Sequence, residues 1–495
     1  MQRALRCVRC RQPTPLITRP FQRNYSDQKR PTTAPKPIID IKHIRQNPEL
    51  YMQTCVERNY KNLIENPGKI VQLHEKWVEL QHNGRSLRER SNLLRKVLAN
   101  PATSRDDEDL KDLLDLSRDV IVEEARKLKK ELSVIEEGEA AAQAEMEALA
   151  LALPNLTGED TPLGKEAEVM AYINEKPVFD EANGNPWRSH VHIGTELGIL
   201  DFTAAATSSG WGWYYLVGAA AELEQALVQY GLAVASRFGW KQVSPPSMVY
   251  SHIGAACGFH PRDQHGEQQI YTIAQNQEDI DRGVPEMSLA GTSEIPLAGM
   301  KANTVIDGKD LPVRRVAVSR CYRAEAGARG ANTKGLYRVH EFTKVEMFAW
   351  VHPDLDFGGE IFEEMLDIQT EILESLGLHC RILSMPAIDL GASAARKVDM
   401  EAWFPSRQHH AGGWGEVTSA SMCTDYQARR LLTRTREKQG SPLEFPWTVN
   451  GTALAVPRVL AALLENGWDE KTNTVLIPEC LRPWMNGKER IGKED

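Results

Sequence analysis

A seven-residue repeat of apolar side chains in the first third of the chain places the strongest constraint on its fold. The repeat occupies Leu114, Ile121, Leu128, Ile135, Ala142 and Leu149. Four residues beyond several of these positions lie Ala125, Leu132, Met146 and Leu153. An earlier run steps by three and four residues through Ile70, Leu73, Trp77, Leu80, Gly84, Leu87, Ser91, Leu94 and Leu98. Such spacing gives each of two helices a narrow apolar seam, which is typical of a coiled coil.

Breaks that contain proline mark the ends of the two runs. The first run ends at Asn100-Pro101 and the second at Pro154-Asn155. Two such helices, joined by a short polar turn, are expected to fold back as an antiparallel coiled-coil hairpin. At about 1.5 Å per residue each helix would be roughly 50 Å long, so the hairpin would project from the body as an arm. Before it, a short helix is expected to begin at Pro48, with Asn47 as its cap.

The predicted arm carries its charge unevenly. Acidic residues gather in the second helix at 106–109 and 136–137, whereas the first helix carries Lys69, Lys76, Arg85, Arg88, Arg90, Arg95 and Lys96. A charge run usually marks a solvated face, and a coiled coil more often serves for dimerisation or spacing than for RNA binding. The net charge of −9 argues against a chain coated with basic residues, but a local basic surface for phosphate binding stays open.

The first thirty residues are rich in arginine and contain a single acidic residue, Asp27. This composition is typical of a mitochondrial transit peptide. Residues 23–26, Arg-Asn-Tyr-Ser, are similar to a matrix-protease site, so 1–25 are predicted to be a transit peptide that directs the chain to the mitochondrial matrix. A disordered basic tail on a cytosolic protein is the alternative. No run of 18 or more apolar residues occurs, so no membrane span is predicted.

From about residue 185 the composition shifts toward aromatic residues, glycine and short β-rich runs. The predicted strands of this part are 313–319, 345–351 and 448–450. The predicted helices are 218–238, 357–376 and 455–465. They do not alternate regularly, which favours a mixed domain with a mainly antiparallel sheet. Neither a Rossmann glycine fingerprint nor a P-loop occurs, so the sequence indicates neither of these nucleotide sites.

The residues best suited to chemistry lie in 319–346, which reads as a strand, a glycine-rich loop and a second strand. Alternation is expected to place Arg323 and Glu325 on one face of the first strand. In the second strand, Phe342, Lys344 and Glu346 are expected to share a side. This mixture suits a ligand with a planar ring, phosphates and an ammonium group, since Arg binds phosphate through paired hydrogen bonds. Surface ion pairs on an exposed sheet are the alternative.

The stretch resembles motif 2 of the class II aminoacyl-tRNA synthetases, with its Arg-x-Glu, loop and closing strand. Tyr230–Val249 resembles motif 1 of that class, and Gly451–Arg458 resembles motif 3. The predicted arm is similar to that of the seryl members, as are the stretches Thr292–Glu294, Gln427–Arg430 and Ile477–Gly487. The resemblance runs from about residue 38 to 490 and depends on several ordered motifs rather than on one match.

The resemblance implies an α+β fold in which an antiparallel-sheet class II catalytic domain at 170–490 follows a tRNA-binding coiled-coil arm at 38–160. It further implies that the chain activates L-serine with ATP and Mg²⁺ and then transfers serine to serine tRNA. In this family the arm grips the long variable arm of that tRNA. Motif 1 implies a homodimer.

For the phosphates of ATP, the resemblance assigns catalytic positions to Arg323 and Arg458. Arg323 would neutralise the α-phosphate during attack, and Arg458 would reach the γ-phosphate with help from Arg338. Glu416 and Ser419 would hold Mg²⁺ between the phosphates, because a hard cation prefers oxygen ligands.

For the base, Glu325 would bind the adenine amino group, while Phe342 and Arg458 would lie on its two faces. The main chain near Val339 would contact the ring. The implied ATP site as a whole is Arg323, Ala324, Glu325, Arg338, Val339, Phe342, Glu416, Val417, Thr418, Ser419 and Arg458.

For serine, Thr292, Ser293 and Glu294 would meet the ammonium end. Glu346 and Thr452 would meet the ammonium or the hydroxyl, and a buried pair satisfied by that hydroxyl would reject alanine strongly. The implied serine site as a whole is Thr292, Ser293, Glu294, Arg323, Glu346, Asn450 and Thr452.

Some positions depart from the usual family pattern. Ser293 stands where many relatives have alanine, and Pro457 stands where glycine is common, whereas Thr418 and Thr452 retain hydroxyl groups. Class II synthetases for threonine, proline or histidine are rival interpretations, but the long arm and Thr292–Glu294 argue against them. A catalytically silent relative is another rival, and it would be favoured by loss of the key charged residues, none of which is lost.

Overall fold

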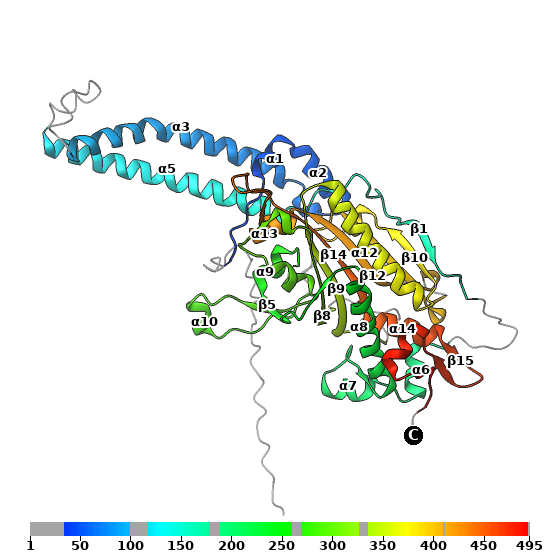
Figure 1. The fold of residues 1–495 in the computed structure, drawn as a ribbon. Coiled ribbons are helices and arrows are strands. Elements are labelled where there is room, and N and C mark those ends of the chain that lie inside the picture. Colours follow the sequence, from blue (N-terminus) through cyan, green and yellow to red (C-terminus); the bar gives the residue numbers. More distant parts are fainter. Residues whose placement is uncertain are drawn as a thin grey trace, which may run out of the picture.

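In the computed structural model the described residues are 34–99, 117–177, 188–259, 269–325, 335–408 and 411–493. The predicted transit peptide 1–25 and the turn between the two arm helices, with Leu114, lie outside them. Two long helices project from a compact body that is built on a large sheet (Figure 1). In the parts of the chain that the structure describes, no helix has both the length and the apolarity needed to cross a membrane.

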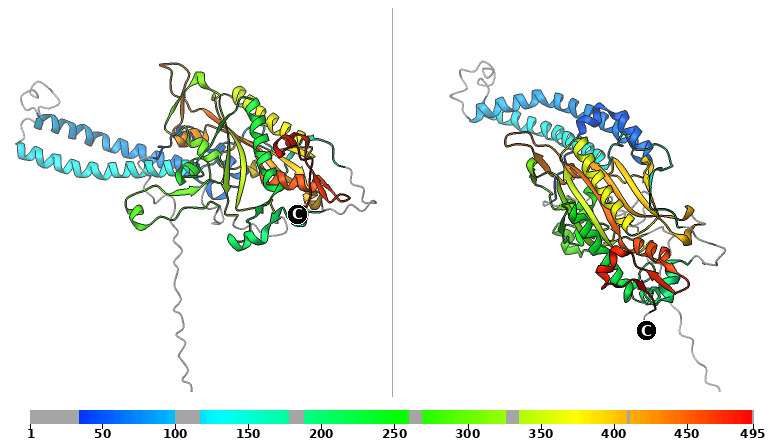
Figure 2. Two further views of the ribbon diagram at one scale, coloured as in Figure 1. Left: turned by 60° about the horizontal axis from the view of Figure 1, so that its bottom comes forward. Right: turned by 45° about the vertical axis from the view of Figure 1, so that its right-hand side comes forward.

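The arm consists of α3 (Asn66–Ala99) and α5 (Arg118–Ala152), which run side by side in opposite directions (Figure 2). The pairing of the two helices covers the predicted seam, in which Ile70, Leu94, Ile121, Leu128, Leu132 and Met146 are buried. Two ion pairs also join the helices, Arg88 with Glu139 at 2.5 Å and Arg90 with Glu124 at 2.9 Å. The predicted antiparallel hairpin is therefore confirmed over its described length.

Two short helices lie at the root of the arm, α1 (Ile41–Gln46) and α2 (Pro48–Glu57). Pro48 occupies the first turn of α2 as expected, but the prediction that the Asn47 side chain caps this helix is wrong. The amide of Asn47 instead donates to the backbone carbonyl of His43 at 3.0 Å, so it closes the preceding helix.

The body is built around an eight-stranded sheet with the strand order β1-β10-β11-β12-β14-β9-β8-β4. Neighbouring strands are antiparallel except for the edge pair β4 and β8. The strands are β1 (Glu168–Ile173), β4 (Lys241–Val243), β8 (Val313–Tyr322), β9 (Glu341–Val351), β10 (Cys380–Ser384), β11 (Arg396–Trp403), β12 (Trp414–Thr424) and β14 (Trp447–Ala455). The expected α+β class with a mainly antiparallel sheet is confirmed.

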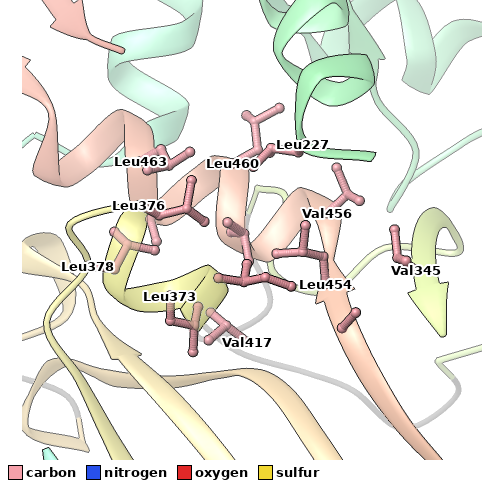
Figure 3. Close-up of a cluster of buried hydrophobic side chains, with 14 of the residues drawn as sticks. Leu227, Val345, Leu373, Leu376, Leu378, Val417, Leu454, Val456, Leu460 and Leu463 are labelled. Carbon is pink, nitrogen blue, oxygen red and sulfur yellow. The ribbon is translucent and has the colours of Figure 1, made fainter. Parts of the chain in front are cut away.

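Three long helices cover one face of this sheet: α8 (Ala219–Arg237), α12 (Leu355–Ser375) and α14 (Val456–Asn466). Figure 3 shows Leu227 of α8 beside Leu460 of α14 and Leu373 of α12 beside Val417 of β12, and Val345 and Leu454 belong to the same buried core. Because this face is filled by apolar side chains, polar side chains of the same strands face the opposite side, where the candidate site lies.

Smaller elements complete the body. The helices are α6 (His190–Glu196), α7 (Phe202–Ser208), α9 (Ser251–Ala256), α10 (Gln277–Asp281), α11 (Glu294–Gly299) and α13 (Tyr426–Leu431). The short strands are β2 (Leu200–Asp201), β3 (Tyr215–Leu216), β5 (Met248–Tyr250), β6 (Met287–Leu289), β7 (Val305–Asp307), β13 (Arg434–Arg436), β15 (Trp468–Asp469), β16 (Thr474–Leu476) and β17 (Arg490–Ile491).

Two buried arginines join the root of the arm to the body. Arg58, just after α2, donates to the backbone carbonyls of Asn155 and Gly391. Arg430 of α13 donates to the carbonyls of Leu151 and Leu153 at 3.0 and 3.2 Å, where α5 ends. Carbonyls at a helix end lack partners within the helix, so Arg430 satisfies groups that would otherwise be left without hydrogen bonds.

Candidate active site

A pocket opens on the polar side of the sheet between β9, β12 and the start of α14. Its walls are Arg323, Glu325, Leu336, Tyr337, Arg338, Val339, Phe342, Lys344, Glu416, Val417, Thr418, Ser419, Thr452, Ala455, Pro457 and Arg458. Every residue of the expected ATP site lines this pocket except Ala324, which lies between two that do. The structure thus brings together side chains that are more than 130 residues apart in the sequence.

The end of β8 differs from the sequence prediction. The strand stops at Tyr322, so the expectation that Arg323 and Glu325 share one of its faces is wrong. Glu325 has a backbone φ of 46°, a left-handed conformation that no strand residue adopts. Both side chains nevertheless reach the pocket: Arg323 lies over the Phe342 ring at 5.2 Å, and Glu325 pairs with Arg338 at 3.1 Å.

At the other end of the pocket, Arg458 at the start of α14 forms an ion pair with Glu416 at 3.2 Å. Its guanidinium lies over the Tyr337 ring at 4.7 Å, and Arg407 lies over the same ring at 4.2 Å. Burial disfavours the charged form of Glu416, but Arg458, Lys397 and Arg323 more than offset it, so its pKa falls to about 2. The pocket therefore holds a carboxylate that is ionised at neutral pH among several cations.

The deeper part of the site is acidic and buried. Glu346 follows Phe342 and Lys344 on the same side of β9, and its carboxylate lies 2.5 Å from the Lys344 ammonium. The hydroxyl of Thr452, on the neighbouring strand β14, donates to Glu346 at 3.2 Å. The predicted common side of Phe342, Lys344 and Glu346 is confirmed.

A second buried carboxylate, Glu294, begins α11 and accepts a hydrogen bond from Gln427 at 2.6 Å. Burial and then the neighbouring Glu346 raise the pKa of Glu294 to about 8, against the effects of Lys344, Gln427 and Arg323. Among the described residues, Oε1 of Gln427 has no hydrogen-bond partner. The amide therefore acts on the site only through the bond that it donates to Glu294.

The other expected serine contacts form the wall behind these carboxylates. The Thr292 hydroxyl accepts the backbone N–H of Glu294 at 3.2 Å, and the Ser293 hydroxyl donates to that of Ser319 at 2.6 Å. Asn450 accepts a hydrogen bond from the Cys423 thiol at 3.4 Å. All three side chains are buried and, like Glu294 and Glu346, they are not among the residues that line the pocket; of the expected serine site, Arg323 and Thr452 line it.

One support of the pocket was not apparent in the sequence. His190, at the start of α6, accepts the backbone N–H of Leu336 on Nε2 at 3.1 Å. Its Nδ1 therefore carries the proton and donates to Glu465 of α14 at 2.7 Å. Gly335 has a φ of 75°, and a Cβ there would lie 2.2 Å from Nε2. The backbone that leads into Tyr337 and Arg338 is thus anchored to α14.

Comparison with known proteins matches both parts of this architecture. Residues 38–157 match the family described as the seryl-tRNA synthetase N-terminal domain, and residues 271–467 match the tRNA synthetase class II core domain (G, H, P, S and T). The mitochondrial serine–tRNA ligase of Schizosaccharomyces pombe is 37% identical over 453 residues, which span 91% of this chain and 88% of the relative. The chain belongs to the seryl-tRNA synthetase family.

Two further comparisons agree with this membership in the seryl-tRNA synthetase family. The mitochondrial serine–tRNA ligase of Saccharomyces cerevisiae is 43% identical over 341 residues, or 68% of this chain and 72% of the relative. A crystal structure of seryl-tRNA synthetase from Pyrococcus horikoshii complexed with ATP superposes with a TM-score of 0.80 at 30% identity, covering 92% of this chain and all of that one. As a family member, the chain is an aminoacyl-tRNA ligase of class II.

Several residues of this family member's site were given no role in ATP or serine binding by the sequence, although Lys344 and Gln427 lie in stretches that it singled out. Lys344 and Tyr337 line the pocket, Arg407 lies over Tyr337, and Gln427 holds Glu294. The alternation of 342, 344 and 346 along a strand was a signal for Lys344, since it must face the same side as its two neighbours. No comparable local signal exists for the contact between Gln427 and Glu294.

Proposed function

We propose that the chain activates L-serine with ATP to form seryl-adenylate and diphosphate, and then transfers serine to the 3′ end of serine tRNA. The observation that carries this proposal is the division of one site into two chemically different parts. A cationic and aromatic part contains Arg323, Phe342 and Arg458, and it adjoins a buried acidic part with Glu294 and Glu346. The first suits a nucleotide triphosphate and the second an ammonium group.

For ATP, Phe342 stacks on the adenine, Glu325 accepts its amino group, and the main chain near Val339 contacts the ring. Arg338 and Arg458 bind the outer phosphates, and Arg323 binds the α-phosphate. In the structure, which holds no nucleotide, the Arg338 side chain is 46% exposed and pairs with Glu325. Val417 and Thr418 complete the walls around these groups, and Ala324 links Arg323 to Glu325.

For serine, Glu294 and Glu346 receive the ammonium, and Thr452 with Glu346 receives the hydroxyl. Thr292, Ser293 and Asn450 hold these groups in place from behind. The serine carboxylate then attacks the α-phosphorus, a new P–O bond forms, and diphosphate leaves with the electrons of the broken P–O bond. Arg323 faces both anions, so it screens their approach and stabilises the charge that develops on the α-phosphate.

Mg²⁺ fits the oxygen donors near the phosphate end. Glu416 and Ser419 line the same pocket wall, and Glu416 stays ionised at neutral pH. Asp399 pairs in register with Ser419, and its buried Oδ1 has no hydrogen-bond partner among the described residues. Glu416 and Ser419 would hold the ion, which supplies charge neutralisation at the β- and γ-phosphates.

The remaining proposals concern assembly and location. The arm at 38–160, as an antiparallel coiled coil, binds serine tRNA, and 170–490 form the catalytic domain. Apolar side chains left exposed near motif 1, such as Met248 and Tyr250 of β5, support a homodimer. The arginine-rich residues 1–25 and the mitochondrial relatives support a transit peptide and a matrix location.

The test is ATP–diphosphate exchange by the purified chain with serine, threonine, alanine or no amino acid. We expect exchange with serine alone, and its loss in Arg323→Ala. If a well-folded protein catalysed no exchange with any of these amino acids, even with tRNA present, the catalytically silent relative would be favoured instead.

A further inference from the structure

Lys344 is a buried cation at the junction between the two parts of the proposed site. It lies on β9 between Phe342 and Glu346, on the same side of the strand, and its side chain is 8% exposed. The ammonium is 2.5 Å from Glu346 and 3.4 Å from the Thr452 hydroxyl. These two partners are the ones proposed above for the ammonium and hydroxyl of serine. Glu346 is proposed above for both of these groups of serine and Thr452 for its hydroxyl, so the Lys344 ammonium is held by side chains that serine would need.

We propose that Lys344 pairs with Glu346 in the free protein and moves to the serine carboxylate and the α-phosphate when the ammonium of serine replaces it on Glu346. This inference rests on the function proposed above and adds a catalytic residue to it. Lys344 lines the same pocket as Arg323, Thr418 and Ser419, so rotation of its side chain would carry the ammonium toward the proposed phosphate site.

The charge balance of the pocket favours such an exchange. Removing one partner of a buried ion pair is strongly destabilising, because it leaves an uncompensated charge. If serine displaced Lys344 from Glu346, the incoming ammonium would replace the cation that leaves, and the incoming carboxylate would give that cation a new partner. A zwitterion can therefore enter without leaving a buried charge unpaired.

A static role is the competing interpretation. Lys344 could remain on Glu346 throughout and serve only to neutralise it. In that case Lys344 would never meet the serine carboxylate, and its removal would not alter how the protein distinguishes a ligand with a carboxylate from one without. The two interpretations therefore predict different effects of removing Lys344 on the ratio of the dissociation constants of these two kinds of ligand, and not only different losses of activity.

The experiment compares serine with serinamide, which keeps the ammonium and hydroxyl but lacks the carboxylate. Dissociation constants are measured by calorimetry without ATP for the full chain, for Lys344→Met and Lys344→Gln, and for the control Lys165→Met, which changes an exposed lysine. In the unaltered protein serinamide must displace Lys344 from Glu346 without providing a carboxylate for it, so serinamide should bind much more weakly than serine. We expect the ratio of the serinamide to the serine dissociation constant to fall at least tenfold in both Lys344 variants and to stay unchanged in the control.

Adenylation is measured in parallel by ATP–diphosphate exchange. Loss of a cation at the α-phosphate is expected to lower kcat by about 10²-fold in the Lys344 variants. Melting curves and ATP binding establish that the variants are folded, and Lys344→Gln retains a polar group for Glu346 if Lys344→Met does not fold. An unchanged ratio in a folded variant would overturn the inference while leaving the proposed function intact. Failure of the unaltered chain to bind serine would instead defeat the proposed function, and the inference with it.

Discussion

The imidazole of His190 holds the backbone of Leu336, accepting its N–H on Nε2 at 3.1 Å while Nδ1 donates to Glu465. Leu336 leads directly into Tyr337 and Arg338, which line the nucleotide part of the pocket. We expect His190→Ala to raise the KM for ATP by about tenfold, since a buried N–H would lose its partner. The KM for serine should change much less.

ATP–diphosphate exchange at varied ATP and at varied serine checks this expectation. The control is His192→Ala, which changes an exposed histidine on the same helix. An equal rise in both KM values would mean that His190 supports the whole domain rather than the ATP site.

The raised pKa of Glu294 predicts a stability that depends on pH. Burial and Glu346 raise that pKa to about 8, so between the unfolded value near 4.5 and about 8 the folded protein holds a proton that the unfolded chain releases. This stabilising contribution is complete below the lower value and is lost as the pH rises through the upper one, by at most about 1.4 kcal/mol per pH unit.

The predicted loss of stability with rising pH is tested by melting temperatures of the unaltered chain and of Glu294→Gln, measured at equal protein concentration from pH 5.5 to 8.5. Glutamine can still accept the Gln427 hydrogen bond but cannot titrate, so the variant should gain stability relative to the unaltered chain as the pH rises. If the melting temperatures of the two proteins changed with pH in parallel, Glu294 would not titrate in this range. Serine-dependent exchange should be lost in the variant.

Arg95 and Lys96, exposed near the outer end of α3, should contribute to tRNA binding without contributing to adenylation. Replacing both by alanine is expected to raise the KM for serine tRNA and to reduce the slope of log affinity against log salt by about 1 for each tRNA phosphate left without its cation. Diphosphate exchange should stay unchanged. Lys471→Ala, an exposed lysine on the body, is the control, and an equal effect there would indicate nonspecific attraction.

Met248 and Tyr250 are 47% and 43% exposed on β5, a strand of the motif 1 region. Tyr250→Glu is expected to convert a dimer into monomers, because it would bury a charge in an apolar contact. Light scattering measures the mass. Leu355→Glu is a matched control, since Leu355 is 73% exposed at the start of α12. A stable monomer of the unaltered chain would contradict the proposed dimer.

The sequence allowed two features to be predicted in detail, and both depend on periodicity. The seam of the arm follows from the seven-residue repeat, since Ile121, Leu128 and Ala142 must share one side of a helix. The common side of Phe342, Lys344 and Glu346 follows from strand alternation. In each case the local backbone geometry alone determines which way the side chains point.

Other features depend on contacts that local geometry does not encode. Gln427 meets Glu294 across 133 residues of sequence, and nothing near either residue specifies the pairing. The end of β8 was placed too late because Glu325 turns into a left-handed conformation, which is uncommon outside glycine and asparagine. Asn47 was expected to cap the start of α2, but its amide donates instead to the carbonyl of His43 in the preceding helix α1.

The buried arginines at the root of the arm, Arg58 and Arg430, have a mechanical consequence. A helix as long as α5, with its 35 residues, spans about 52 Å, so a tilt of about 1° at its root would displace the far end by about 1 Å. A small change in the orientation of α5 at its root therefore produces a larger displacement at its outer end. The hydrogen bonds to Asn155, Gly391, Leu151 and Leu153, together with the apolar cluster at the root, therefore limit how far the outer end of α5 can move.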